Sequence, residues 1–157
     1  MKLAEALLHR VALKTEIAQL ESRIVKNALV QEGEEPQEDS NVLLREFVKK
    51  NEELTRLITR IQRTNAREKL IGPDDKPLES TLQDALVKRD GRMTLAESLR
   101  SIGGNAMPDM RYRQMEIKLI TTLDIAEIQY DANRLAKEGR ELDILIQKTN
   151  WAVELAE

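Results

Sequence analysis

The stretch LAEALLHRVALKTEIAQLESRIVKNALV, residues 3–30, decides the fold because its apolar residues recur every three or four positions. Side chains at this spacing lie on one side of a helix. The stretch is rich in good helix formers, and the first glycine or proline of the chain is Gly33. We therefore predict a helix over residues 3–30, with an apolar stripe that another helix must cover. The stripe consists of Leu3, Ala6, Leu13, Ile17, Leu20 and Ile24.

The same spacing returns twice along the chain. It predicts a second helix over residues 41–67, with Leu44, Phe47, Leu54, Ile58 and Ile61 in its stripe. It predicts a last helix over residues 125–156, with Ile128, Ala132, Leu135, Leu142, Ile146 and Val153. Gly33 and Pro36 break the first pattern, and Asp39 or Ser40 can cap the second helix. A break of this length lets the second helix fold back antiparallel on the first.

Shorter elements are predicted between these helices. A helix over residues 81–102 would be capped by Ser80 or Thr81 and ended by Gly103 and Gly104. The segment IGPDDKPL, residues 71–78, predicts a turn or small hairpin. Residues 115–123 alternate in polarity, which predicts a strand that pairs with this hairpin or with another subunit. The fold class is therefore mainly α: one domain, 1–157, of long antiparallel helices in a coiled-coil-like bundle with a small β-hairpin or strand.

Polar and small residues also occupy stripe positions. Asn51 and Asn65 in the second helix would favour one alignment of the helices, and Gly139 would permit a close approach. The segments IQRTN, residues 61–65, and IQKTN, residues 146–150, occur at matching places in their helices. They are either a chance resemblance or two equivalent elements with matched polar ends.

Composition limits the classes of function. The net charge of −3 and the pI near 5.4 argue against nucleic acid or anionic lipid as partners, since both require a surplus of basic residues. The chain has no cysteine, so disulfides, thiolate catalysis and cysteine-based zinc sites are excluded. No apolar run approaches the ~20 residues of a membrane-spanning helix, and the first residues do not form a signal peptide. We expect a soluble, cytoplasmic protein.

No catalytic or metal-binding set can be assembled from the residues. His9 is the only histidine, which is too few for a metal site or a catalytic triad. The acidic break of residues 32–39 lacks the spacing of a calcium loop. The basic residues between Lys88 and Lys118 have only Tyr112 as a nearby aromatic for stacking nucleic acid bases. We expect no enzymatic activity, no cofactor and no metal.

Five segments in order resemble one known family: IVKNALVQEGEEPQED (24–39), IQRTN (61–65), TLQDALVKRD (81–90), EIKLITTLDIAEIQ (116–129) and RELDILIQKTNW (140–151). Together they are similar to the septicolysin-like family of small bacterial proteins, mostly without an assigned activity. The resemblance implies a helical fold and, from the family name, a cytolysin; it brings no catalytic motif. It draws attention to positions near helix ends, namely Asn27, Gln31, Gly33, Asn65, Asn150 and Trp151. It also marks Glu32, Arg89 and Asp90, and we expect structural roles for the whole set.

Three functions are consistent with the sequence. The first is a non-enzymatic helical protein that forms a homo-oligomer through its long helices. The second is a membrane-active cytolysin, which would lyse cells by contact with the lipid bilayer. The third is a nucleic-acid or regulatory binding module that uses the region from Lys88 to Lys118.

Overall fold

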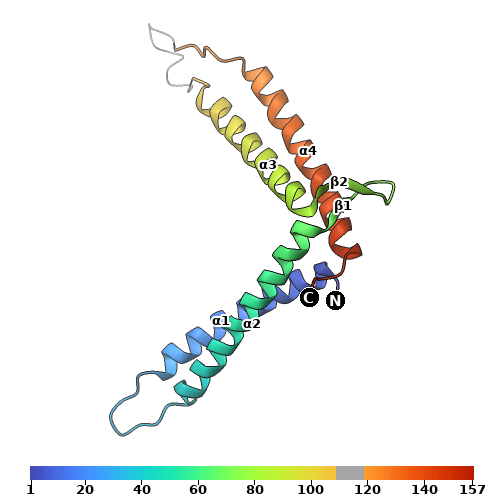
Figure 1. Cartoon of the computed structure of the whole chain (residues 1–157). Helices are drawn as coiled ribbons and strands as arrows, with labels where there is room; N and C mark the ends of the chain where they lie inside the picture. The colour runs from blue at the N-terminus through green and yellow to red at the C-terminus, as the bar shows by residue number, and fades with distance from the viewer. Residues whose placement is uncertain (109–118) are drawn as a thin grey trace. The chain divides into compact units, whose positions relative to one another are not determined.

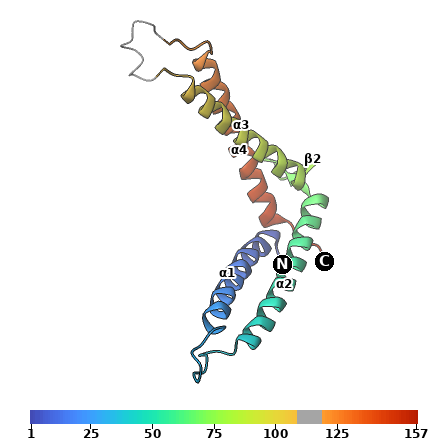
Figure 2. The same cartoon turned by 90° about the vertical axis from the view of Figure 1, so that its left-hand side faces the viewer.

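The computed structural model describes residues 1–108 and 119–157, and it is mainly α-helical (Figures 1 and 2). The elements in chain order are α1 (Leu3–Asn27), α2 (Ser40–Arg67), β1 (Lys69–Ile71), β2 (Pro77–Thr81), α3 (Leu82–Asn105) and α4 (Ile125–Ala152). The predicted fold class, long antiparallel helices with a small β-hairpin, is confirmed.

The described residues form two compact units. Unit 1 contains residues 1–68 and 149–157, and unit 2 contains residues 69–148.

Unit 1 is built on the antiparallel pair of α1 and α2 (Figure 2). On α1 the buried apolar residues include Leu3, Ala6, Leu13 and Leu20, all of them in the predicted stripe. On α2 the buried residues are Leu43, Leu57, Ile61 and Thr64. Each fully buried leucine contributes roughly 1.5–3 kcal/mol to folding, so this α1–α2 seam is the main stabilising feature of unit 1.

The predicted stripe of α2 is wrong in part. Leu44 is exposed, and Ile58 is only partly covered, whereas their neighbours Leu43 and Leu57 are buried. Asn51 and Asn65 are also partly covered, and the buried polar residue in this region is Thr64. At positions 44 and 58 the seam of α2 therefore lies one residue before the predicted one, while Ile61 is buried as predicted.

The C-terminal segment completes unit 1 by bonding to both helices. The Leu3 amide donates to the Val153 carbonyl at 3.0 Å, and the Leu155 amide donates to the Met1 carbonyl at 2.9 Å. The Ala156 amide donates to the Thr64 hydroxyl at 2.9 Å. Thr64 and Thr149, at the same place in the two IQxTN segments, are both buried. This matching burial favours the interpretation of the two segments as equivalent elements.

Helix α1 ends at Asn27, three residues before the predicted end. The buried Asn27 side chain donates to the Arg23 carbonyl at 2.9 Å and accepts from the Glu38 amide at 3.1 Å. It therefore fastens the end of the loop to the end of the helix, and Asp39 then caps α2 as predicted.

Unit 2 begins with the β1–β2 hairpin, which confirms the prediction for residues 71–78. Its turn is closed by a hydrogen bond from the Gly72 amide to the Lys76 carbonyl at 2.8 Å, and Asp75 has a positive φ of 63°. The ammonium group of Lys148 on α4 donates to the Gly72 carbonyl at 2.8 Å and pairs with Asp75 at 2.6 Å. Thr81 then forms a reciprocal capping box with Asp84 that starts α3.

Helices α3 and α4 pack through small residues. Ala96, Leu135 and Ala136 form a buried cluster, with Leu99 packed against it. Gly103 and Gly104 do not end α3, which runs to Asn105. Gly103 is buried, and a Cβ there would lie 3.3 Å from Ile128 of α4, so this glycine serves packing rather than termination.

Two remaining predictions concern the segment before α4 and its end. The first four residues of the predicted strand, 115–118, lie outside the described residues, and the other five, 119–123, form no strand, so that part of the prediction is wrong. Helix α4 begins at Ile125 as predicted and ends at Ala152, because the chain beyond it leaves the helix to bond with the first residues of α1. Within residues 1–108 and 119–157, none of the helices has the length and apolar character needed to cross a bilayer.

Candidate functional site

The positions singled out by the sequence are distributed over several places. Asn27 is buried at the end of α1, and Gln31, Glu32 and Gly33 are exposed in the following loop. The Gln31 carbonyl accepts from the Glu34 amide at 3.0 Å, and Gly33 has a φ of +93°, which favours glycine. These contacts fix the conformation of the loop. No carboxylate of the loop lines any of the pockets found in the described residues.

The other candidates of unit 1 lie near the C-terminal ends of α2 and α4. Asn65 is partly covered, Asn150 is buried and Trp151 is 56% exposed. The side chains of Asn150 and Trp151 therefore lie in different environments, one in the core and one at the surface. None of the pockets described below contains any of the three.

Arg89 of α3 joins its helix to α4. Its guanidinium donates to Asp143 at 2.8 Å and to the adjacent Asp90 at 2.9 Å. The hydrogen bond to Asp143 is the main reason that the pKa of Arg89 lies above its ordinary value. Asp90 lies next to Arg89 on α3, whereas Asp143 lies on α4. The ion pair that joins the two helices is therefore Arg89–Asp143.

A pocket of about 500 Å³ lies beside this ion pair and is lined by Arg89, Met93, Gly139, Arg140, Asp143 and Ile144. Gly139 allows α4 to lie close to α3, because a Cβ at this position would lie only 2.7 Å from the Met93 sulfur. The predicted role of Gly139 in close approach is consistent with this geometry. Arg89 and Asp143 of the lining are paired with each other, and no nucleophile and base are paired in the pocket.

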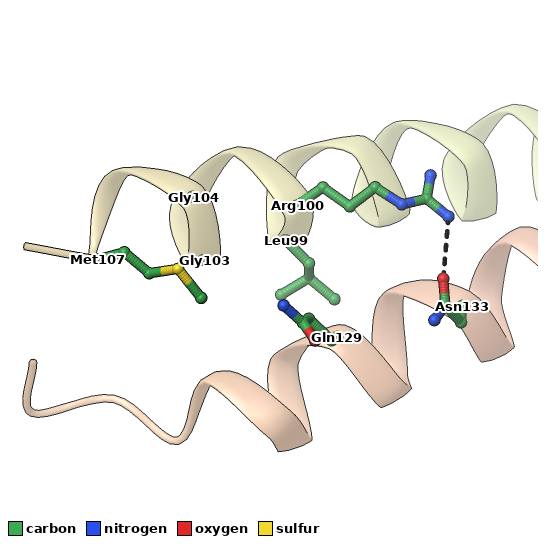
Figure 3. Close-up of a pocket in the computed structure, with 7 residues that line it drawn as sticks. All are labelled: Leu99, Arg100, Gly103, Gly104, Met107, Gln129 and Asn133. Atoms are coloured by element: carbon green, nitrogen blue, oxygen red, sulfur yellow. Dashed lines mark hydrogen bonds between the residues drawn. The ribbon is translucent and has the colours of Figure 1, made fainter. Parts of the chain in front are cut away.

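A second pocket, of about 370 Å³, lies between α3 and α4 nearer to the loop that joins them (Figure 3). Its lining comprises Leu99, Arg100, Gly103, Gly104, Met107, Gln129 and Asn133. Arg100 donates to the Asn133 amide oxygen at 3.3 Å across the pocket. This lining has one cation and two amides but no carboxylate, imidazole or hydroxyl, so it offers no general acid or base.

The residues that the structure describes contain no group of three or more His, Asp or Glu side chains able to hold a metal ion. His9 lies on the surface of unit 1, where its Nε2 atom is 3.7 Å from a Glu53 oxygen. This contact is typical of a pair of exposed side chains on neighbouring helices rather than of a metal centre.

A different feature distinguishes α1: a second heptad stripe that points away from the seam and carries no charge. We call it the outer stripe of α1, and it consists of Ala4, Leu8, Val11, Thr15, Ala18, Ser22 and Val25. Its members recur at alternating four- and three-residue spacing over the whole helix. Leu8, Val11 and Val25 are 64%, 57% and 70% exposed. Large aliphatic side chains in such regular order are typical of a helix that has a second partner.

Helix α2 carries a similar outer stripe, one residue after its seam. It consists of Leu44, Val48, Asn51, Thr55, Ile58, Gln62 and Asn65, and it too contains no charge. A shallow hollow of about 460 Å³ lies along it, lined by Phe47, Val48, Asn51, Glu52, Thr55 and Arg56. Asn51 and Asn65, which the sequence indicated as seam residues, belong to this outer stripe.

Both outer stripes turn to the same side of the hairpin. Each residue advances about 100° around a helix, so the stripe of α2, one residue after its seam, is rotated by about that angle. The outer stripe of α1 follows the seam of α1 by one or two residues. It is therefore rotated away from that seam in the same direction, when each helix is viewed from its N-terminus to its C-terminus. Because the two helices run in opposite directions (Figure 1), these rotations carry both stripes to one side. Lys14 and Glu21 are charged positions of α1 between the stripes.

The opposite side of the hairpin is charged and internally paired. Glu16 of α1 pairs with Lys50 of α2 at 2.8 Å, and His9 lies close to Glu53. The hydrogen bond between Glu16 and Lys50 lowers the pKa of the carboxyl and raises the pKa of the ammonium group. Unit 1 is therefore two-faced: one side holds its helices together with ion pairs, and the other carries the two uncharged outer stripes, with Lys14 and Glu21 between them. The sequence contained the signal for this, an uncharged heptad beginning at Ala4, but the stronger seam pattern masked it.

The chain belongs to a family of unknown function, DUF6847, whose sequence profile matches residues 10–155. It is also similar to a solved structure described as a functionally unknown conserved protein from Corynebacterium diphtheriae, with 34% sequence identity and a TM-score of 0.87. That similarity covers 99% of this chain and 98% of the other. No curated protein matches the chain. The resemblance to the septicolysin-like family is therefore wrong: its five segments are short pieces of amphipathic helix and loop, too generic to identify a family.

Proposed function

We propose that this protein is a non-enzymatic, self-associating helical protein, and that copies meet through the side of the α1–α2 hairpin that carries the outer stripes. The observation that carries the proposal is the pair of outer stripes, both without charge, which expose Leu8, Val11 and Val25 on α1 and Leu44 and Val48 on α2. The hypothesis of a cytolysin rested on a family name that does not apply, and it loses its support.

The physical reason is the free energy of the exposed apolar surface. Burying one exposed valine or leucine side chain contributes up to about 1.5–3 kcal/mol, and a symmetric contact buries each residue twice. Leu8, Val11 and Val25 alone would therefore offset much of the entropy that two molecules lose when they associate. The absence of charge from both stripes removes the main desolvation cost.

The absence of enzymatic activity belongs to the same proposal. In two pockets of unit 2, Arg89 is bonded to Asp143 and Arg100 to Asn133, and neither pocket pairs a nucleophile with a base. A role in binding nucleic acid has weaker support than self-association, because Arg89 and Arg92 are neutralised by Asp143 and Glu138.

Two single variants test the proposal, one with an alanine of the outer stripe of α1 replaced by glutamate and one with an alanine outside that stripe replaced by glutamate. Ala18 lies in the middle of the outer stripe of α1, and Ala12 is exposed on the same helix outside the stripe. Ala18→Glu should raise the dissociation constant of the oligomer by about tenfold or more, since it places a charge in the buried contact. Light scattering after size-exclusion chromatography measures the molar mass of both variants over a range of loading concentrations.

Ala12→Glu is the matched control, because it makes the same chemical change on the same helix. It should associate nearly as the unmodified protein does, and circular dichroism should show both variants folded. Equal association of the two variants and the unmodified protein would refute the proposed surface.

A further inference from the structure

We propose that the occupant of the outer stripe of α1 is the α1 helix of a second copy, packed antiparallel about a two-fold axis near residues 16 and 17. This inference rests on the proposed function and specifies its partner, its direction and its register. The stripe is the starting point, since all of its residues except Ala4, which is buried, are exposed.

The stripe is self-complementary when it is read in opposite directions. Residues whose numbers add to 33 then face each other: Leu8 meets Val25 of the second copy, Val11 meets Ser22, and Thr15 meets Ala18. Each layer thus pairs a larger side chain with an equal or smaller one, and the small residues at the centre let the helix backbones approach closely. The Thr15 hydroxyl already donates to the Val11 carbonyl at 3.2 Å, so its donor stays satisfied when the contact is buried.

Charge complementarity fixes the same register. In an antiparallel pair of helices, the residues that flank the core on each side meet their counterparts from the other helix. On one flank, Lys14 faces Glu21 of the second copy, and the two-fold axis repeats this pair. On the other flank, Glu5 faces Lys26. Neither Lys14 nor Glu21 forms an ion pair in the described part of the chain, so both charges are available to a partner.

Other registers place like charges together. A slip of seven residues in one direction sets Lys14 against Lys14 of the second copy, and a slip in the other direction sets Glu21 against Glu21. A parallel pair in register joins Glu21 to Lys26 but leaves Lys14 facing Gln19. The antiparallel register centred between residues 16 and 17 therefore pairs the most opposite charges.

Engineered cysteines test this register directly, because the chain contains no cysteine of its own. Val11→Cys and Ser22→Cys are made as separate single variants of the full chain that carry tags of different mass. In the proposed pair, residue 11 lies opposite residue 22 of the other copy, while two copies of residue 11 lie about 16 Å apart along the axis. A disulfide requires Cα atoms within about 7 Å.

We expect a disulfide-linked heterodimer when the two single variants are mixed and mildly oxidised, and little linked dimer from either variant alone. A mixture of Val11→Cys with Thr94→Cys, an exposed position on α3, controls for random collision and should stay unlinked. Linked homodimers from each single variant would establish a parallel pair and overturn the inference.

The failure of the inference and the failure of the proposed function give different results. A protein that associates in solution but gives no heterodimer from the Val11→Cys and Ser22→Cys mixture would use another contact, such as the outer stripe of α2, and only the inference would be wrong. A protein that stays monomeric throughout would refute both.

A charge exchange provides a second measurement that does not depend on oxidation. Lys14→Glu should raise the dissociation constant by about tenfold, because each of the two flanking pairs becomes repulsive. Glu21→Lys should do the same, and the double variant Lys14→Glu with Glu21→Lys should restore association. Effects of the two single variants that simply add in the double variant would contradict the Lys14–Glu21 contact.

Discussion

Asn27 shows how a single side chain determines where a long helix ends. The apolar spacing of α1 could continue past this residue, and nothing before Gly33 forbids a helix. The helix ends because the Asn27 amide bonds to both the Arg23 carbonyl and the Glu38 amide, and so draws the far end of the loop against it. A contact eleven residues away in sequence is not visible in the local pattern, which explains why the predicted helix was three residues too long.

Glycines in helices differ in what surrounds them, and this difference can be measured. Gly91 in α3 has open space where a Cβ would be, whereas a Cβ at Gly139 in α4 would lie 2.7 Å from the Met93 sulfur. Gly91→Ala should raise the free energy of unfolding by about 0.5–1 kcal/mol, through helix propensity and a less flexible unfolded chain. Gly139→Ala should gain less than this or lose stability, since Met93 must move.

Urea unfolding followed by circular dichroism compares these two variants with the unmodified protein. Both glycines lie in unit 2, so the comparison concerns the same part of the fold. An equal gain for both would show that Met93 moves without cost and that Gly139 is not needed for close packing.

At the scale of elements, the sequence was sufficient to predict the helices, the hairpin and two of the caps. These features depend on local chemistry: apolar spacing, turn residues at 71–78, Asp39 before α2 and Thr81 before α3. It was not sufficient to choose the seam of α2, because two apolar stripes lie side by side there. Lys50 occupies a seam position and pairs with Glu16, so the true seam contains a charge and looks the weaker of the two.

The Glu16–Lys50 pair makes the stability of unit 1 depend on pH. The pKa of Glu16 is lower in the folded protein than its ordinary value of 4.5, so the folded state favours the charged carboxylate. The contribution of the pair is therefore complete above that value, and it is lost as the pH falls through the folded pKa. Glu16→Gln should remove this part of the loss of stability below about pH 4.5, with a small effect because the pair is exposed.

Thermal melting temperatures between pH 3 and pH 7 measure this effect. Glu52→Gln is the matched control on α2, since Glu52 forms no ion pair within residues 1–108 and 119–157. Identical pH profiles for Glu16→Gln and the unmodified protein would show that the Glu16–Lys50 pair contributes nothing to stability.

For the molecule as a whole, the fold class followed from the sequence, but the candidate site did not. The singled-out positions Asn27, Asn65 and Asn150 were marked by short motifs, and the structure places them in separate surroundings at helix ends and in the core. The side of unit 1 that carries the two outer stripes extends along two helices, and it can be recognised only when the seam that faces inward is known. A surface of this kind is a property of the folded unit rather than of any motif.

Sedimentation equilibrium of the unmodified chain tests whether copies of this protein associate. If they meet through the outer stripes, the average mass should increase reversibly above the 18.0 kDa of one chain as the concentration rises through the micromolar range. A mass of 18.0 kDa at every concentration, from protein that melts cooperatively, would contradict it.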